Sequence, residues 1–252
     1  MTAPSLPPEE RRSVLDDLQR RYGAGSATAR RRLRRKQVAW VLFVGGAKAV
    51  KRSLDIAVSL TALLLLSPLF AVVALCIRLT DGGPVLFWQV RVGKHGKTFR
   101  FPKFRSMVVN AEKLKETLLA RNDHAGPSAD ARGQVTFKMK NDPRITWIGR
   151  IIRKLSIDEL PQLWCVLKGE MTLVGPRPAL PREVEKYSLA DRRRLDVTPG
   201  LTCFWQIEGR GDIPFPQQVE LDVKYIESQN PWLDLVILVR TVPAVLLGKG
   251  AY

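Results

Sequence analysis

The chain has 252 residues, enough for one or two domains with a sizeable hydrophobic core. Lysine and arginine outnumber aspartate and glutamate by 41 to 24, and the resulting formal charge of +17 predicts anionic partners. Three widely spaced cysteines, Cys76, Cys165 and Cys203, form neither a metal-binding motif nor an obvious disulfide framework. A zinc-finger or disulfide-scaffold protein is therefore excluded, and a reducing compartment is expected.

Residues 1 to about 36 are predicted to form a flexible or partly helical extension, without an early apolar region that would indicate a signal peptide. Three interpretations of its basic cluster stay open. It could be a solvated tail, or it could bind anionic lipid, with each charge contributing on the order of 1 kcal/mol. It could also bind nucleic acid, although the cluster lacks interleaved aromatic residues. The cluster consists of Arg30, Arg31, Arg32, Arg34, Arg35 and Lys36.

A long apolar run extends from Ile56 to Ile77, with Ser67 and Pro68 at its middle. It is long enough to span a bilayer. However, Pro68 lacks a backbone donor and bends a helix, and basic residues (Arg52 and Arg78) flank both ends. We therefore expect a re-entrant helix that returns to the same face, with Ser67 bonding a freed carbonyl. A kinked transmembrane span and a buried core helix are the alternatives.

Downstream, segments 85–90 and 98–101 are strand-prone, with a turn at 93–96, and predict a small β-hairpin. Helices are expected at 109–121, 146–154, 159–168, 181–195 and 216–228, with a polar loop at 122–134. The apolar stretch 231–248 is interrupted by charges and proline, which favours an interfacial or core helix. The predicted class is α+β, mainly helical and membrane-associated.

The most informative segment pairs Asp158 with Glu159, between Arg153 and Arg177. One carboxylate could attack phosphorus, the other could hold a metal, and the arginines could bind phosphate oxygens as bidentate forks. A structural alternative is a capping box, in which Ser156 and Glu159 cap a helix and Asp158 complements its dipole. The two interpretations are compatible, because free backbone N–H groups at a helix start also favour a phosphate.

Lys103 and Arg105 add two cations beside aromatic residues at the end of the predicted hairpin. The alternative interpretation is a strand edge protected by charge. Both histidines, His95 and His124, fall in polar loops. We therefore expect them at the surface, without a role in catalysis.

Two further turns present polar groups. The segment 199–202 is expected to form a turn, and it is followed by the polar residues Gln206 and Arg210. A second turn, at Asp142 and Arg144, predicts a local ion pair.

These segments together resemble the bacterial sugar transferase family, the monotopic polyprenyl-phosphate phosphoglycosyl transferases. The resemblance runs from about Lys48 to Tyr252 and most closely matches the type that initiates exopolysaccharide or O-antigen synthesis. Cys203 departs from the pattern, since many relatives have glycine there. The matching motifs are KRSLDI, the Ser-Pro-broken apolar run, GGPVLFWQVRVGKHGKTF, KFRSM, DPRITWIGRIIRKLSIDELPQLW, KGEMTLVGPRP, TPGLTCFWQIEGR and TVPAVLLGKGAY.

The resemblance implies a minimal catalytic form, with a basic extension over residues 1–47 and a transferase domain over 48–252. The membrane helix would cover about 53–79 and the catalytic region about 80–252. The resemblance also implies a location in the bacterial inner membrane, with the catalytic domain on its cytoplasmic face. Anionic lipids are expected as partners and nucleic acid is not. A homo-oligomer stays open.

The implied reaction moves a sugar 1-phosphate from a UDP-sugar to undecaprenyl phosphate and releases UMP. Asp158 would form a covalent phosphosugar, and Glu159 would help to bind Mg²⁺. UDP-glucose and UDP-galactose are the first candidates, and an N-acetylated sugar stays open. A non-catalytic scaffold and a single-span basic binding protein are the rival functions. The implied phosphate and substrate contacts are Arg153, Arg177, Lys103, Arg105, Gln206 and Arg210.

Overall fold

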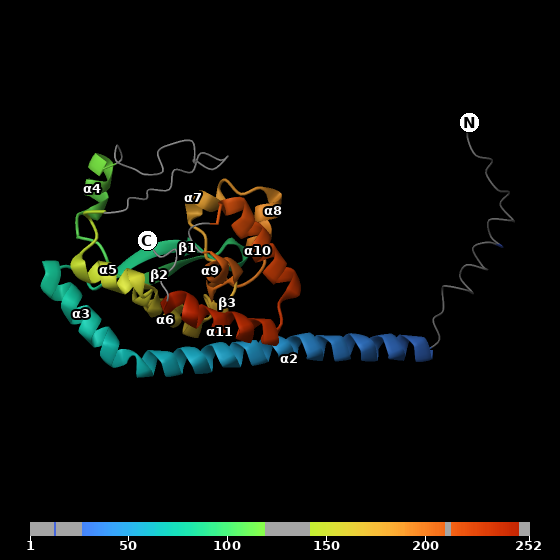
Figure 1. The fold of residues 1–252 in the computed structure, drawn as a ribbon. Helices are drawn as coiled ribbons and strands as arrows, with labels where there is room; N and C mark the ends of the chain where they lie inside the picture. Colours follow the sequence, from blue (N-terminus) through green and yellow to red (C-terminus); the bar gives the residue numbers. More distant parts are fainter. Residues whose placement is uncertain (1–12, 14–26, 119–141, 210–212, 247–252) are drawn as a thin grey trace, which may run out of the picture. The chain divides into compact units, whose positions relative to one another are not determined.

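The computed structural model of the protein describes residues 13, 27–118, 142–209 and 213–246. The chain divides into two compact units, Met1–Val50 and Lys51–Tyr252. Most described residues are helical, and the strands form two small sheets, which confirms the mainly helical α+β prediction (Figure 1). The predicted loop at 122–134 and His124 lie outside the described residues.

The described helices are α2 (Ala27–Leu65), α3 (Ser67–Asp81), α4 (Ala111–Leu118), α5 (Trp147–Lys154), α6 (Leu163–Lys168), α7 (Pro181–Val184), α8 (Leu189–Arg192), α9 (Phe204–Glu208), α10 (Phe215–Ser228) and α11 (Pro231–Leu246). Short 3₁₀ helices are η1 (Lys94–Gly96), η3 (Ile157–Gln162) and η4 (Arg193–Leu195), and the strands are β1 (Leu86–Val92), β2 (Thr98–Phe104), β3 (Thr172–Val174) and β4 (Gly200–Thr202). The single helix expected at 181–195 is wrong. Ser188 and Asp191 form a capping box that starts a new helix inside that range.

The apolar run bends between α2 and α3, where Ser67 and Pro68 were expected to break it. Pro68 cannot donate to the carbonyl of Leu64, four residues earlier, and the Ser67 hydroxyl donates to that carbonyl instead, at 2.8 Å. The predicted bend and its serine contact are confirmed. Within the described residues no single helix could cross a bilayer, but Gly45–Leu65 and Ser67–Asp81 together have the required length and composition, with a 58° bend.

The buried-core alternative for this run is wrong, because most of its large apolar side chains are exposed. Val73 and Ile77 are exceptions, since they pack with Phe104, Ile148 and Ile152 in a small hydrophobic cluster. The exposed members are Ile56, Val58, Leu60, Leu64, Leu65, Leu69, Val72 and Leu75.

Strands β1 and β2 form the predicted antiparallel hairpin, with Gln89 opposite Phe101. His95 in the connecting turn is exposed, as expected. Strands β3 and β4 form a parallel pair that the sequence analysis did not predict. The turn expected at 199–202 is therefore wrong. A Cβ on Gly200 would lie 2.1 Å from the backbone nitrogen of Gly175, so this pairing requires glycine at position 200.

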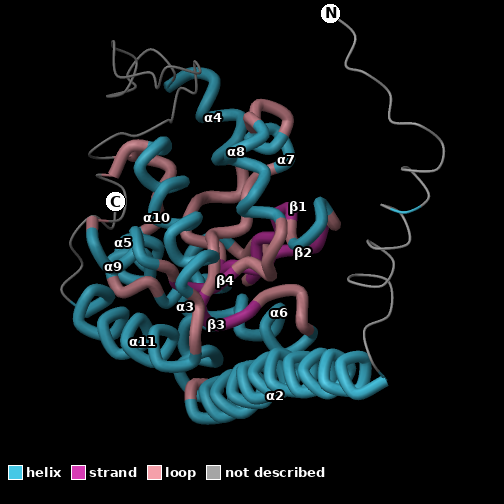
Figure 2. The backbone as a smooth tube through the Cα atoms, turned by 90° about the vertical axis from the view of Figure 1, so that its right-hand side faces the viewer, coloured by secondary structure: helices cyan, strands magenta, loops and turns pink. Residues whose placement is uncertain are grey.

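The main hydrophobic core lies between the hairpin, the β3–β4 pair and helices α6, α10 and α11 (Figure 2). Its largest buried side chains include Phe101, Met171, Tyr225 and Ile237. Because these elements come from distant parts of the sequence, the core fixes the loops between them, and those loops carry the site described below.

Charged residues of α2 attach it to this core. Arg52 donates to the carbonyl oxygens of Val166 and Leu167 at 2.6 Å each, at the end of α6. Buried Asp55 accepts from the backbone nitrogen of Leu173 at 3.0 Å and from the hydroxyl of Thr172 at 2.7 Å. The motif KRSLDI thus holds the start of the apolar run against α6 and β3.

An ion pair also joins α2 to α11. Lys51 forms an ion pair with Asp234 at 2.5 Å and donates to the carbonyl oxygen of Val174 at 3.1 Å. The hydroxyl of Tyr225 donates to the same Asp234 carboxylate at 2.7 Å. Asp234, one of the charges that interrupt the C-terminal apolar stretch, is therefore paired and hydrogen-bonded inside the fold.

Candidate active site

Asp158 and Glu159 lie on η3, directly after a sharp turn that ends α5. Ser156 at this turn has φ 54° and ψ 21°, a left-handed conformation that is uncommon for a residue other than glycine. Its side chain makes no capping bond, so the predicted capping box is wrong. Ser156 instead joins α5 to η3, which packs against β2.

Two cations from distant segments meet Glu159. Lys103 on β2 contacts its Oε1 at 2.6 Å, and Arg177, in the turn after β3, lies 3.5 Å from the same oxygen. Burial acts to raise the pKa of Glu159, but the charges of Lys103 and Arg177 outweigh it and lower this pKa to about 2. Glu159 is therefore an ionised carboxylate held between two cations.

Asp158 has different surroundings, although it is the adjacent residue. It is 8% exposed, and burial raises its pKa to about 6 against the lowering effect of Lys103. The charge of Glu159 raises this pKa further, while Arg153 lowers it. Asp158 is thus ionised at neutral pH but weakly stabilised as an anion, which suits a carboxylate that attacks an electrophile.

The structure therefore brings together Asp158, Glu159, Lys103, Arg177 and the charge of Arg153. This convergence was expected from the sequence for the four residues around 153–177, and Lys103 joins them from the hairpin. The arrangement offers an anionic nucleophile next to cations that can neutralise phosphate oxygens.

Arg105 does not join this cluster. It forms an ion pair with Asp81 at the end of α3, and its side chain is buried. Gly83 permits this position, because a Cβ there would lie 2.0 Å from the Arg105 guanidinium. The strand-edge alternative is also not supported, since the cation points into the fold. The structure therefore places Arg105 as a link between α3 and the hairpin.

The remaining candidates are less central. Gln206 lies on α9, where its side-chain oxygen is 3.5 Å from the Cys203 sulfur, and Arg210 lies outside the described residues. The predicted ion pair between Asp142 and Arg144 is confirmed, at 2.6 Å. It orders the turn that precedes α5.

The sequence analysis missed Arg91 on β1. This buried guanidinium donates to the carbonyl oxygen of Pro178 at 3.0 Å and helps to lower the pKa of Glu159. The signal was its position in a strand: in the hairpin register Arg91 lies opposite Phe99, which is buried. A buried arginine on the inward face of a strand is costly unless its guanidinium is hydrogen-bonded or paired with an anion.

The carboxylate pair can be compared with the needs of Mg²⁺. The described residues contain no group of three or more His, Cys, Asp or Glu side chains that could hold a metal ion. Mg²⁺, however, is often bound by one or two carboxylates together with water and substrate phosphates. Glu159 supplies hard oxygen ligands of this kind, so this carboxylate could hold Mg²⁺ in the company of a phosphorylated substrate.

Comparison with known proteins identifies the class to which this site belongs. The model of the family described as "Bacterial sugar transferase" matches residues 46–248, so the chain belongs to the bacterial sugar transferase family. This match confirms the resemblance drawn from the motifs.

Three relatives illustrate the similarity. The exopolysaccharide production protein ExoY of Sinorhizobium fredii is 41% identical over 80% of this chain and 88% of its own length. The galactosyl transferase CpsE of Streptococcus agalactiae is 48% identical, over 80% of this chain and 43% of its own length. The undecaprenyl-phosphate galactose phosphotransferase of Salmonella typhimurium is 46% identical, over 81% of this chain and 42% of its own length. The chain thus spans most of ExoY but less than half of the other two.

Proposed function

We propose that this protein transfers a sugar 1-phosphate from a UDP-sugar to undecaprenyl phosphate, as a first step of exopolysaccharide or O-antigen synthesis. The observation that carries the proposal is the convergence of Asp158, Glu159, Lys103 and Arg177. Relatives named for undecaprenyl-phosphate galactose and glucose phosphotransfer support the reaction class. Another is named as a UDP-galactose-lipid carrier transferase, which supports the donor.

In the proposed first step an oxygen of Asp158 attacks the β-phosphorus of the donor. The bond from this phosphorus to the bridging oxygen breaks, and UMP leaves with the electron pair. Arg177 and Lys103 would neutralise charge on the phosphate oxygens, because both lie beside the carboxylate pair where the phosphate would react.

In the proposed second step a phosphate oxygen of undecaprenyl phosphate attacks the same phosphorus. The bond to Asp158 breaks, which returns the free carboxylate and gives undecaprenyl-diphospho-sugar. Mg²⁺, held by Glu159 with help from the substrate phosphates, would screen the diphosphate charge. Arg153 contributes positive charge beside Asp158.

We further propose that the protein acts at the cytoplasmic face of the bacterial inner membrane. The exposed apolar side chains of α2 and α3, and the bend between these helices, support a re-entrant element. Helices α5 and α11 also expose apolar residues, as interfacial helices would. Those residues are Trp147 and Ile151 on α5, with Leu155 directly after it, and Trp232, Leu235, Val239 and Val242 on α11.

The test is UMP release by the purified protein in detergent, with Mg²⁺, undecaprenyl phosphate and a panel of UDP-sugars. We expect release with one donor and its loss in Asp158→Asn. Without acceptor, a covalent mechanism predicts a burst of about one UMP per protein, because the phosphosugar stays on Asp158. Release that survives in folded Asp158→Asn would contradict the assigned nucleophile, and silence with every donor would favour a scaffold.

A further inference from the structure

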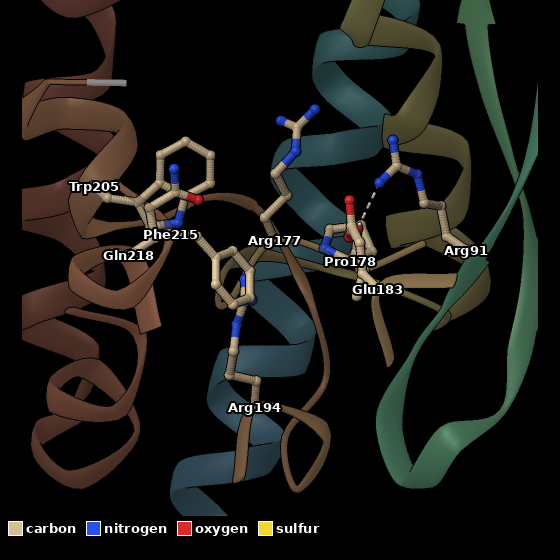
Figure 3. Close-up of a pocket in the computed structure, with 9 residues that line it drawn as sticks. Arg91, Arg177, Pro178, Glu183, Arg194, Trp205, Phe215 and Gln218 are labelled. Atoms are coloured by element: carbon tan, nitrogen blue, oxygen red, sulfur yellow. Dashed lines mark hydrogen bonds between the residues drawn. The ribbon is translucent and has the colours of Figure 1, made fainter. Parts of the chain in front are cut away.

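Arg177 needs more than Glu159 to fix its position in the site. Its guanidinium lies 3.5 Å from the Glu159 carboxylate, a longer contact than the 2.6 Å of Lys103, and its side chain is 30% exposed. In Figure 3, Arg177 lies between Trp205 on one side and Arg91 on the other. Arg91 carries the same charge and repels it. A partly exposed cation beside a like charge keeps one orientation only if another group attracts it.

The ring of Trp205 provides this attraction. The guanidinium carbon of Arg177 lies 5.9 Å from the ring centroid, within the range in which an aromatic face attracts a cation. A guanidinium can also stack on such a face, which limits its orientation. The Trp205 side chain belongs to α9 and is buried. The position of this ring therefore determines where Arg177 presents its donors.

A buried carboxylate, that of Asp222 on α10, faces the nitrogen of the Trp205 ring. Helix α9 packs against α10, and Asp222 is completely buried, at 0% exposed. A buried indole N–H usually finds an acceptor. Within the described part of the chain no other acceptor bonds the indole nitrogen of Trp205, and its N–H lowers the pKa of Asp222 as a hydrogen-bond donor does. Asp222 therefore fixes the orientation of the ring.

Asp222 is itself held by Arg194 on η4. The Arg194 guanidinium pairs with the Asp222 carboxylate at 2.7 Å and donates to the hydroxyl of Tyr187 at 2.9 Å. Burial raises the pKa of Asp222 to about 6, although Arg194 and the indole of Trp205 act to lower it. Replacing a buried ion pair by apolar side chains is often neutral or stabilising, so stability alone explains this pair poorly.

Asp222 has no direct access to the reacting groups. The cavity drawn in Figure 3 has a volume of about 120 Å³, and Arg177, Arg194 and Trp205 line it, whereas Asp222 does not. Among the described residues, the ion pair of Asp222 is with Arg194 and not with an active-site cation. Any effect of Asp222 on the reaction must therefore pass through a neighbouring residue.

We propose that Asp222 is a positioning residue for the transfer reaction: it fixes the Trp205 ring, and the ring holds Arg177 towards the phosphate that Asp158 attacks. The inference rests on the proposed function for the phosphate, whereas the contacts among Asp222, Trp205 and Arg177 do not depend on it. Arg177 is assigned to charge that develops during the reaction. A misplaced Arg177 should therefore lower kcat more than it raises KM.

The first experiment measures UMP release by the full-length protein in detergent, with Mg²⁺, undecaprenyl phosphate and the donor that the wild type uses. Asp222→Asn removes the charge but keeps the shape, and Trp205→Phe keeps a ring but cannot donate to Asp222. We expect each variant to lower kcat by about tenfold or more, with little change in KM, since a misplacement of about 1 Å can cost about a hundredfold. Glu227→Gln is the matched control, because it breaks the exposed 2.9 Å pair with Arg193 between the same elements, α10 and η4. It should keep the wild-type kcat.

Arg177→Lys tests whether the effect passes through Arg177. Lysine keeps the charge but lacks the planar group that stacks on Trp205. Adding Asp222→Asn to Arg177→Lys should lower kcat by less than about twofold, because the position that Asp222 maintains is already lost. Losses that multiply would overturn the proposal, as would a wild-type kcat in folded Asp222→Asn. Trp205→Phe decides the matter if Asp222→Asn fails to fold.

A second measurement needs no turnover. Phenylglyoxal modifies accessible guanidinium groups, and mass spectrometry follows its reaction at Arg177, with exposed Arg150 as the internal reference. Modification of Arg177 should be severalfold faster in Asp222→Asn and Trp205→Phe than in the wild type or Glu227→Gln. Unchanged modification in both variants would overturn the inference even if kcat falls. Faster modification in a protein that turns over no donor would support the positioning contacts and reject the proposed reaction.

Discussion

The two adjacent carboxylates of the site experience opposite electrostatic effects. Burial dominates at Asp158 and raises its pKa to about 6, whereas the charges of Lys103 and Arg177 lower that of Glu159 to about 2. Neighbouring residues in a helical turn point in different directions, so one can be desolvated while the other meets two cations. Ionised Asp158 therefore lowers the stability of the folded protein, whereas ionised Glu159 increases it.

This difference predicts opposite effects of two isosteric substitutions. A raised pKa means that ionised Asp158 destabilises the folded state as the pH rises above its unfolded pKa, and the full cost is present above about 6, so Asp158→Asn should increase the free energy of unfolding at pH 7.5. A lowered pKa means that ionised Glu159 stabilises the fold above its unfolded pKa, so Glu159→Gln should decrease it. Each change is expected to be on the order of 2 kcal/mol, measured by thermal unfolding in detergent.

The pH dependence provides the control for this prediction. The gain from Asp158→Asn should shrink as the pH falls from about 6 towards 4, because wild-type Asp158 becomes protonated. The loss from Glu159→Gln should persist at pH 5 and disappear only as the pH falls towards about 2. Two changes of the same sign at pH 7.5 would contradict these assignments.

At the scale of elements, the bend between α2 and α3 has two causes that can be separated. Pro68→Ala restores the backbone donor that the carbonyl of Leu64 lacks, so we expect the helix to straighten towards a full span. Ser67→Ala removes only the 2.8 Å hydroxyl bond to that carbonyl, and the bend should remain. Accessibility labelling of tags at both chain ends in membrane vesicles is the measurement. If both ends of Pro68→Ala still label from the same side, the prediction is wrong.

Asp55 carries a second prediction about α2. Asp55→Ala would leave the backbone nitrogen of Leu173 without its partner inside the fold, at a cost of about 1–3 kcal/mol. For a protein of this size we expect Tm to fall by roughly 5 °C. Asp55→Asn keeps an acceptor oxygen and should lose less, and substitution of exposed Lys48 by alanine should have little effect. An unchanged Tm in Asp55→Ala would show that the contact does not hold α2 in place.

The sequence predicted the features that depend on residues close together in the chain, and it did not predict those that depend on tertiary contacts. Periodicity and proline chemistry act within a few residues, so the hairpin, the bend at Pro68 and helix α10 were expected. The parallel pair of β3 and β4 was not, because a three-residue strand has no period and its pairing depends on close contact between Gly175 and Gly200. Likewise, the motif around Asp158 indicated chemistry, but the partnership of Arg105 with Asp81 is a tertiary contact without a local signal.

For the whole molecule, the formal charge of +17 would attract the protein to an anionic membrane surface. Exposed arginines near the start of α2 concentrate part of it at Arg31, Arg32, Arg34 and Arg35. Near an anionic bilayer each contributes on the order of 1 kcal/mol, an attraction that falls within a Debye length and weakens with added salt. If this segment binds anionic lipid, its position as well as its charge should matter.

Replacing these four arginines by glutamine should therefore weaken binding to phosphatidylglycerol vesicles by between about tenfold and a thousandfold. Binding to neutral vesicles, and UMP release in detergent, should stay unchanged, because none of the four belongs to the site. The matched control replaces four exposed lysines of the transferase domain by glutamine, which changes the net charge equally: Lys94, Lys97, Lys168 and Lys186. Vesicle sedimentation at about 0.1 M and 1 M salt is the measurement. Equal losses in both variants would show that overall charge alone attracts the protein, whereas a loss confined to the arginine variant, and removed by high salt, would identify the extension as a lipid-binding element.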